Sequence, residues 1–350
     1  MWRIALRDLQ WRRRRLVIST LGTSLVFTMA LVLAGLAGSF GVEADNALRA
    51  AGADAWVVHA NTPGPFTAGL PVPGAAVANV GRLPGVKEAG GFIYAQQAIG
   101  SGTQPTDANL FGTDSRRVGT PVPSQGRQPR SDSEAMIDDT LPYSIGDHII
   151  VGAKAFRVTG LLRGSTLLSG TPNVFVTLRA AQRLLLGGQP LVTAVLTKGT
   201  PATTPAGLKV LSLDQVRADM TRPLAKAQQV VAFIEIFLWL IAACIIGSVV
   251  YVSALEKTRD FAVIKATGGS NRQLMVTLAI QAAVISLGAA AVAAVLANLL
   301  TPLFPILVVI PVWSVLLLPV VAIVLGLLAS IAGLSRAVAV EPAMAFGGPG

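Results

Sequence analysis

Charged residues and cysteine are both scarce in this sequence. Only 13% of its 350 residues are Asp, Glu, Lys or Arg, against about 25% in a soluble globular domain, and 52% are hydrophobic. This composition excludes an ordinary soluble protein and indicates a membrane protein. The single cysteine, Cys244, excludes an intrachain disulfide, and we expect it to pack as a small residue within an apolar run.

Residues that catalysis or metal binding would need are also few. The sequence has no Gly-x-x-x-x-Gly-Lys-(Ser/Thr) loop to cradle nucleotide phosphates and no Gly-x-Ser-x-Gly elbow. The two histidines, His59 and His148, lack metal-ligand spacing. Asp138 and Asp139 could suggest a catalytic pair of carboxylates, but adjacent residues on a strand point to opposite faces. A turn or a helix cap is therefore the better explanation of this pair. We therefore expect no catalytic residue, metal site or cofactor in this chain.

The net charge of +10 follows the pattern of a membrane protein. Basic residues gather at the N-terminus and in one loop between apolar runs, and they form no continuous face for nucleic acid. Residues 1–15 predict a basic amphipathic leader in the cytoplasm, whose arginines contact lipid headgroups or supply a second cytoplasmic contact. We expect no nucleic-acid partner.

The apolar runs predict four transmembrane helices, because a bilayer core is about 30 Å thick and needs about 20 apolar residues. A cleavable signal peptide is a competing interpretation of the first run, but its apolar core would span only about 7–15 residues. Four spans place both termini in the cytoplasm. We expect the first helix at residues 16–40, a stalk and the second helix at 222–253, the third helix at 274–300, an outer loop at 301–311, the fourth helix at 312–334 and a cytoplasmic tail at 335–350.

Between the first and second apolar runs the sequence becomes that of a Gly- and Pro-rich soluble domain. Residues 41–221 alternate short strand-like and helical stretches, which predict a large extracytoplasmic α+β domain. Ser212 and Gln215 predict a capping box, and the helix that begins there would form a stalk broken near Pro223. Residues 43–51 predict a matching stalk that continues the first helix.

A charged loop at residues 254–273 separates the second and third apolar runs. Its four Lys and Arg residues place it in the cytoplasm, since short basic loops stay inside. Phe261, Ile264 and Gly268 recur at helical spacing, and Gly269 follows as a helix-ending residue. The loop therefore predicts a short amphipathic helix.

Residues 259–270, Arg-Asp-Phe-Ala-Val-Ile-Lys-Ala-Thr-Gly-Gly-Ser, resemble the signature that opens the FtsX-like permease domain of MacB-like ABC transporters. Asp260, Thr267 and Gly269 stand where that family usually has Glu, Leu and Ala. The tail also resembles the family's closing pattern, without its usual basic residue. The predicted outer domain resembles the MacB-like periplasmic core in several short pieces, at residues 52–57, 83–86, 110–114, 134–141, 146–147 and 156–162.

The resemblance implies an ABC transporter permease subunit in the cell membrane, working as a homodimer with a separate cytoplasmic ABC ATPase subunit that holds ATP and Mg. The charged loop would be its coupling helix, with Asp260 and Lys265 as polar contacts and Phe261 and Ile264 as the apolar anchor. Motion of the outer domain would serve export or mechanotransmission, with membrane lipids and an envelope adaptor or substrate as further partners. The residues expected to contact the ATPase are Glu256, Lys257, Arg259, Asp260, Phe261, Ile264, Lys265, Gly268 and Gly269.

Glu235 is the one ionisable residue inside a predicted span, which makes it a functional candidate. Glu235 would lie near the outer surface of the membrane. There its carboxylate could equally form a hydrogen bond in a dimer interface or face a water-filled groove. A membrane-anchored regulator or sensor of cell-envelope processes would share this topology. A small-solute importer, for example of amino acids, would normally need more spans, and an extracellular enzyme would need a site that the sequence lacks.

Overall fold

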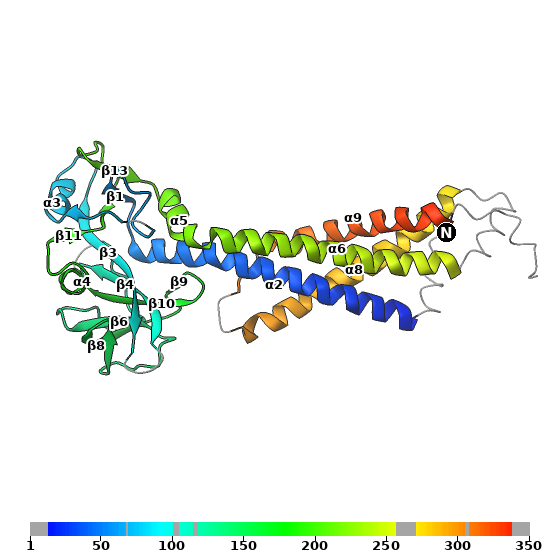
Figure 1. Cartoon of the computed structure of the whole chain (residues 1–350), viewed down its shortest axis with the longest axis horizontal. Helices are drawn as coiled ribbons and strands as arrows, with labels where there is room; N and C mark the ends of the chain where they lie inside the picture. Colours follow the sequence, from blue (N-terminus) through cyan, green and yellow to red (C-terminus); the bar gives the residue numbers. More distant parts are fainter. Residues whose placement is uncertain are drawn as a thin grey trace, which may run out of the picture. The chain divides into compact units, whose positions relative to one another are not determined.

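The computed structural model describes residues 13–67, 69–100, 105–114, 118–256, 271–304 and 308–337; it leaves undescribed the side chains of 13–16, 253–254, 256, 271–275, 277 and 329–337. The chain divides into two compact units. The helical unit comprises Met1–Gly38 and Ala227–Gly350, and the α+β unit comprises Ser39–Lys226. Figure 1 shows the helices of the first and the sheet of the second.

Long apolar helices make up the described part of the helical unit. Three helices are long and apolar enough to cross a membrane, with candidate spans at Val17–Ala51, Leu213–Val252 and Leu278–Leu303. The predicted fourth span corresponds to a shorter apolar stretch, Val312–Leu328. The elements are α2 (Arg13–Ala51), α6 (Ala225–Glu256), α8 (Asn271–Leu300), the 3₁₀ turn η2 (Thr301–Leu303) and α9 (Val312–Ala337).

Small residues bring the helices of this unit together. The buried face of α8 includes Ala282, Ser286 and Ala289, and a Cβ at Gly326 of α9 would lie 2.8 Å from the Ser286 hydroxyl. A Cβ at Gly35 of α2 would likewise lie 2.8 Å from a methyl group of Val308. Such small-residue contacts are typical of helices that pack in lipid, where close backbone approach replaces hydrophobic burial.

Helix α6 is covered least by the rest of the chain. Of the residues in its most apolar stretch 11% are buried, against 44% for α2 and 33% for α8. Cys244 is exposed on this helix, so the expectation that it packs within the chain was wrong. Large apolar side chains are exposed beside it, at Val230, Phe233, Ile234, Ile236, Phe237, Leu240 and Ile241.

The α+β unit is built on one mixed sheet, with a separate two-stranded sheet of β11 and β2. The main path runs β13-β1-β12-β3-β4-β10-β6-β8-β5, with β7 and β9 attached at its side. The strands are β1 (Ala55–His59), β2 (Val72–Pro73), β3 (Glu88–Ile99), β4 (Thr106–Thr113), β5 (Gln125–Gly126), β6 (Glu134–Asp138), β7 (His148–Val151), β8 (Lys154–Leu162), β9 (Thr166–Leu167), β10 (Thr171–Thr177), β11 (Leu191–Val192), β12 (Ala194–Lys198) and β13 (Leu208–Leu211). Its helices are α3 (Ala75–Gly81), α4 (Leu178–Leu185), α5 (Leu213–Thr221) and the 3₁₀ turn η1 (Arg222–Leu224).

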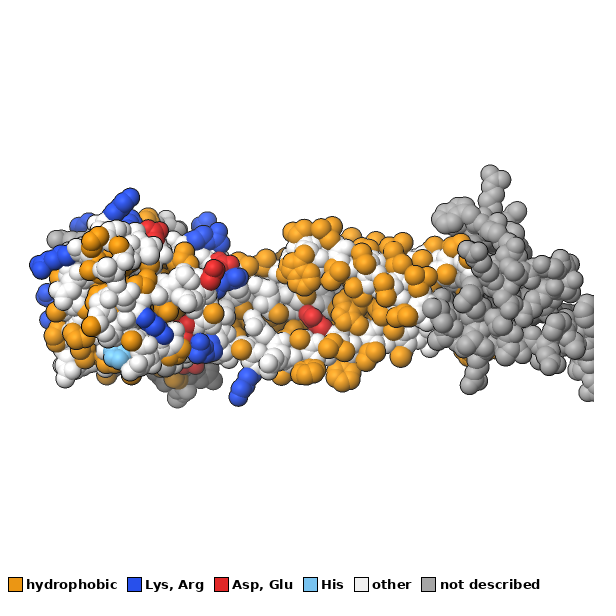
Figure 2. Space-filling model, turned by 90° about the horizontal axis from the view of Figure 1, so that it is seen from above, with side chains coloured by type: hydrophobic (Ala, Val, Ile, Leu, Met, Phe, Trp, Pro, Cys, Tyr) orange, Lys and Arg blue, Asp and Glu red, His pale blue; other side chains and the backbone are white. Residues whose placement is uncertain are grey.

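The chain enters and leaves this sheet through neighbouring strands. Strand β1 follows α2 after a short turn, β13 precedes α5, and the two strands pair antiparallel with Trp56 opposite Leu211. Charged side chains gather over the α+β unit, whereas hydrophobic side chains cover the visible face of the helical unit (Figure 2). The sequence-based prediction of apolar helices with a large α+β domain inserted between the first and second is therefore confirmed.

Both predicted stalks are helical. Helix α2 continues without a break to Ala51, as expected. Ser212 and Gln215 form the predicted capping box at the start of α5, with each side chain bonded to the other residue's backbone N–H. The expected break at Pro223 is the 3₁₀ turn η1, since proline removes a backbone donor there.

Candidate functional site

Most of the residues predicted to contact an ATPase lie outside the described part of the chain. Glu256 is the last residue of α6, and its side chain is not described. The others fall between residues 257 and 270, which the structure does not describe. Their role stays a prediction.

Glu235 lies on α6, half-buried between exposed neighbours. Phe233 is 63% exposed and Phe237 is 64% exposed. Among the described residues, no hydrogen-bond or ion-pair partner faces the Glu235 carboxylate. A carboxylate on an apolar helix needs water or a polar partner, and the described part of this chain does not supply a protein one.

The described residues offer a different candidate site, in the α+β unit, where the two stalk helices meet the sheet domain. Glu43 of α2 is 2% exposed and holds the turn between β9 and β10. Its Oε1 accepts from the Thr166 hydroxyl at 3.1 Å and from the Gly170 N–H at 3.0 Å, and its Oε2 accepts from the Ser169 N–H at 3.0 Å. The turn includes Leu168 and Ser169 at positive φ, a conformation that is costly for residues other than glycine. The carboxylate therefore stabilises a strained turn.

Asp219 of α5 makes an equivalent contact to another loop. Its side chain is fully buried, and its carboxylate accepts from the Phe66 N–H at 2.8 Å and from the Thr67 hydroxyl. Gly64 lies against the same carboxylate, where any side chain at this position would overlap it. Each stalk thus carries one buried acid that bonds to a loop distant in sequence.

The two stalks are also tied to each other. Arg217 of α5 donates through Nε to the Asp45 carboxylate of α2, at 2.9 Å. A Cβ at Gly41 would lie 2.8 Å from Nη2 of the same arginine, so glycine permits the approach. Both partners of the ion pair are more than 40% exposed, and such pairs contribute about 0.2–1 kcal/mol. The buried carboxylates are therefore the stronger links.

Apolar side chains of both stalks enter the core of the domain beside these links. Leu48 of α2 and Val216 of α5 belong to one buried cluster with Trp56 of β1 and Phe92 of β3. The Trp56 and Phe92 rings lie 4.8 Å apart in an edge-to-face arrangement, a geometry that adds about 0.5–1.5 kcal/mol to burial. Each stalk is thus held by both packing and hydrogen bonds.

Asp138, Glu134 and His59 make local hydrogen bonds within the α+β unit. Asp138 is buried and accepts from the Thr140 N–H at 3.0 Å, which confirms a turn at this pair of acids. The hydrogen-bonded Arg127 guanidinium lowers the pKa of Glu134 to about 2. His59 accepts from the Asn61 N–H, and the described residues include no cluster of three His, Cys, Asp or Glu side chains that could hold a metal.

Comparison with known proteins agrees with this architecture. Residues 16–209 match the model of the MacB-like periplasmic core domain, and residues 232–342 match that of the FtsX-like permease C-terminal region. A protein of Mycobacterium tuberculosis named as an uncharacterised ABC transporter permease is 45% identical over 347 residues. One with the same description from Mycobacterium bovis is 43% identical over 345 residues, and each alignment covers 99% of both chains.

Solved structures also align with part of this chain. The periplasmic region of MacB from Actinobacillus actinomycetemcomitans aligns with a TM-score of 0.36 and 12% identity, covering 49% of this chain and 94% of that one. The extracellular domain of the ABC-type transporter YknZ from Gram-positive bacteria aligns with a TM-score of 0.33 and 14% identity, covering 45% and 98%.

The two family matches and the apolar helices define a membrane protein with an extracellular domain. The chain belongs to the ABC transporter permeases that combine a MacB-like periplasmic core domain with an FtsX-like C-terminal region, as its resemblance predicted. Sequence reasoning missed Glu43 and Asp219 as candidate functional residues. Their partners lie 123–127 and 152–153 residues away, so no local pattern could have identified them.

Proposed function

We propose that this permease couples ATP hydrolysis by a separate cytoplasmic ATPase subunit to motion of its extracellular domain, for export or mechanotransmission. The observation that carries the proposal is the pair of buried carboxylates, Glu43 and Asp219, one on each stalk helix. Each bonds to a different loop of the domain, so displacement of either helix would pull on a distinct part of the sheet.

These hydrogen bonds favour a mechanism in which movement of a stalk helix moves the loop that is bonded to it. An N–H left unpaired in a fully buried site costs about 1–3 kcal/mol, and Glu43 pairs two N–H groups that are part-buried. Motion would then concentrate where the helices are weakest. That place is η1, at Arg222–Leu224, because a proline-containing 3₁₀ turn lacks the regular helical ladder. Helix α2 has no such break. The α2 stalk would therefore move as one rigid helix, whereas the α5 stalk would bend at η1.

Membership of the ABC transporter permeases supports the rest of the proposal. Four spans would place both termini and the loop at residues 254–273 in the cytoplasm, where that loop would dock on the ATPase. ATP and Mg would bind the partner subunit, and lipids would surround the spans. The domain boundaries proposed are those given by the sequence, with residues 41–221 outside the membrane.

A second copy of the chain would cover α6. This helix exposes a band of large apolar side chains, and Glu235 among them has no partner in the described part of the chain. Lipid would accept the apolar band, but it would leave the carboxylate unpaired. A homodimer packed through α6 would supply a polar partner across the interface.

The test of coupling is ATP turnover in membranes that contain this chain and its ATPase subunit. The variant Asp260→Arg/Phe261→Ala should release the ATPase from the membrane, because it reverses a charge and removes the predicted apolar anchor. Asp107→Arg, an exposed acid on β4, is the matched control and should change neither association nor turnover. Unchanged association in the double variant would refute the coupling role and favour an anchored sensor.

A further inference from the structure

A pocket of about 240 Å³ lies in the α+β unit beside the 3₁₀ turn η1. Thr67 contributes to its lining from the loop that is bonded to Asp219. Leu168 contributes from the turn that is bonded to Glu43, and Pro223 contributes from η1 itself. This η1 pocket therefore contacts both stalk-bound loops and the proline at which the α5 stalk would bend.

The η1 pocket has an uncharged lining. None of the described residues that line it is charged. The carboxylates of Glu43 and Asp219 are buried and bonded to the two loops, and they are not part of the lining. A charged ligand would lose its hydration there without gaining a counter-charge, which costs free energy. The pocket therefore favours a neutral ligand.

Polar side chains of the lining have hydrogen-bonding positions to offer. Thr67 and Thr193 each donate the hydroxyl hydrogen to an acceptor of the protein, so their oxygens keep lone pairs for a ligand. Gln96, exposed on β3 and hydrogen-bonded to the Tyr94 hydroxyl, keeps one amide N–H and its Oε1. Ligand hydroxyl groups suit this set, because each of them can both donate and accept.

Aromatic rings complete the lining. Phe66 and Tyr94 both belong to it, and the faces of such rings attract polarised C–H groups. The volume lies below the range of about 300–1,000 Å³ that encloses drug-sized ligands, so the pocket suits one small ring and not a long chain. A sugar ring combines hydroxyl groups, C–H faces and neutrality.

We propose that the η1 pocket binds a neutral sugar ring, with its hydroxyl groups on Gln96, Thr67 and Thr193. The ring would contact both stalk-bound loops and Pro223 at once, and it would thereby restrain bending at η1. The regulatory meaning of this restraint rests on the proposed coupling function, whereas the binding does not.

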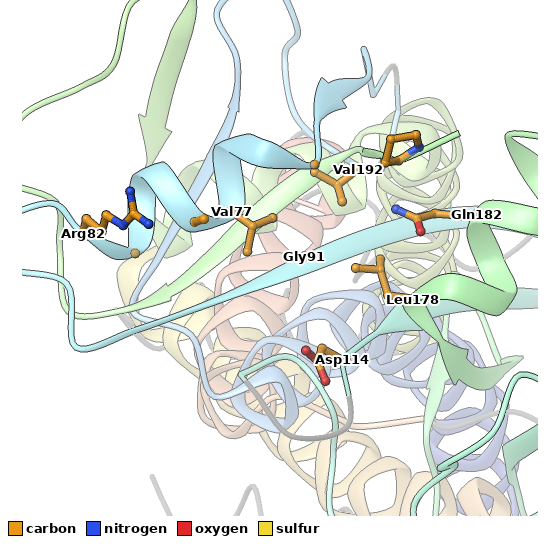
Figure 3. A pocket seen from close by; sticks show the side chains of 11 residues that line it. Val77, Arg82, Gly91, Asp114, Leu178, Gln182 and Val192 are labelled. Atoms are coloured by element: carbon orange, nitrogen blue, oxygen red, sulfur yellow. The ribbon is translucent and has the colours of Figure 1, made fainter. Parts of the chain in front are cut away.

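A larger pocket in the same unit provides the comparison site. It measures about 500 Å³ and lies between α3 and α4, where Val77, Leu178 and Val192 surround Gly91 (Figure 3). Its lining includes the charged Arg82, unlike that of the η1 pocket. A sugar bound in this second pocket would depend on α3 and not on Gln96.

The binding test is a saturation-transfer NMR titration of the full-length chain in lipid nanodiscs, with empty nanodiscs as background. The neutral probes are glucose, galactose, mannose and N-acetylglucosamine, and the charged probes are glucosamine and glucuronate. At least one neutral sugar should bind, and the charged probes should bind at least about tenfold more weakly. Gln96→Ala should weaken the neutral sugar by about fivefold, the equivalent of one hydrogen bond.

Gln97→Ala is the matched control, because adjacent strand residues point to opposite faces and Gln97 is not part of the lining. It should leave the affinity unchanged, as should Arg82→Gln in the comparison pocket. The proposal is overturned if no neutral sugar binds at high millimolar concentration, or if a charged probe binds more tightly. An equal loss in the Gln96 and Gln97 variants, or a loss in Arg82→Gln alone, would also overturn it.

Hydrogen–deuterium exchange in the same nanodiscs tests the restraint on η1. At a sugar concentration of about twice the dissociation constant, peptides covering residues 222–224 should exchange about threefold more slowly, because bound ligand opposes opening. Unchanged exchange with sugar bound would refute the restraint. Neither measurement needs the ATPase subunit, so their failure is distinguishable from failure of the coupling function.

Discussion

Replacing Glu43 by alanine should loosen the turn between β9 and β10. The change removes three hydrogen bonds and leaves the N–H groups of Ser169 and Gly170 without their acceptor in a part-buried site. Two such groups cost roughly 2–6 kcal/mol. Removing a buried carboxylate also removes the free-energy cost of its desolvation. We therefore expect a net cost at the lower end of this range, about 2 kcal/mol. This corresponds to roughly a thirtyfold increase in the equilibrium constant for opening of the turn.

Hydrogen–deuterium exchange of the full-length chain in nanodiscs measures this opening directly. Peptides that cover residues 166–170 should exchange roughly thirtyfold faster in Glu43→Ala than in wild type. Glu43→Gln keeps one carbonyl acceptor and should give a smaller increase. Asp45→Ala, two residues along the same helix, removes only the exposed ion pair with Arg217 and is the matched control.

Two results would refute the reasoning. Unchanged exchange at residues 166–170 in Glu43→Ala would mean that the turn holds its conformation without the carboxylate. Equal acceleration in Glu43→Ala and Asp45→Ala would mean that any change on the stalk loosens the domain, so that the buried bonds have no special part.

Two further predictions concern acid stability and assembly. The Arg127 guanidinium holds the pKa of Glu134 at about 2, below its ordinary range, so the pair's contribution is complete above about pH 4.3 and is lost as pH falls toward about 2. Wild type should therefore exceed Glu134→Gln by about 1 kcal/mol in free energy of unfolding near neutral pH, since Arg127 is 43% exposed, and the difference should vanish at low pH. Exposed Cys244 should cross-link two copies through a bismaleimide in membranes if α6 faces α6, giving a species of twice the mass on a denaturing gel.

Each of these two predictions has an outcome that would contradict it. A stability difference between wild type and Glu134→Gln that stays constant with pH would contradict the ion-pair account. For the cross-link, Val295→Cys in a Cys244→Ala background places a thiol at an exposed position of α8 and should give monomer only. Dimer from the α8 thiol and none from Cys244 would place the interface elsewhere.

Local signals in the sequence predicted the local features well. Ser212 and Gln215 are three residues apart, and Pro223 disrupts the helical turn in which it lies. The cap at the start of α5 and the break after it could therefore be predicted. The apolar runs likewise predicted the helices that carry candidate spans. Each of these features depends on the chemistry of a few neighbouring residues.

Long-range contacts were beyond such reasoning. Glu43 and Asp219 look like ordinary helical acids in the sequence, and only the fold brings Ser169 and Phe66 to them. Cys244 was expected to pack because it lies in an apolar run, yet hydropathy does not tell which side of a helix is covered. In a lipid environment both sides are apolar, so composition alone cannot separate a core face from an exposed one.

The pairing of β1 with β13 makes the α+β unit exchangeable. Because the chain enters and leaves through adjacent strands, the ends of the inserted domain lie close together, the condition under which one domain tolerates insertion into another. Evolution could replace the stretch between Trp56 and Leu211 by another sheet whose first and last strands pair, provided that its loops again donate hydrogen bonds to Glu43 and Asp219 of the two helices. The same permease scaffold could thereby acquire new extracellular specificities by grafting.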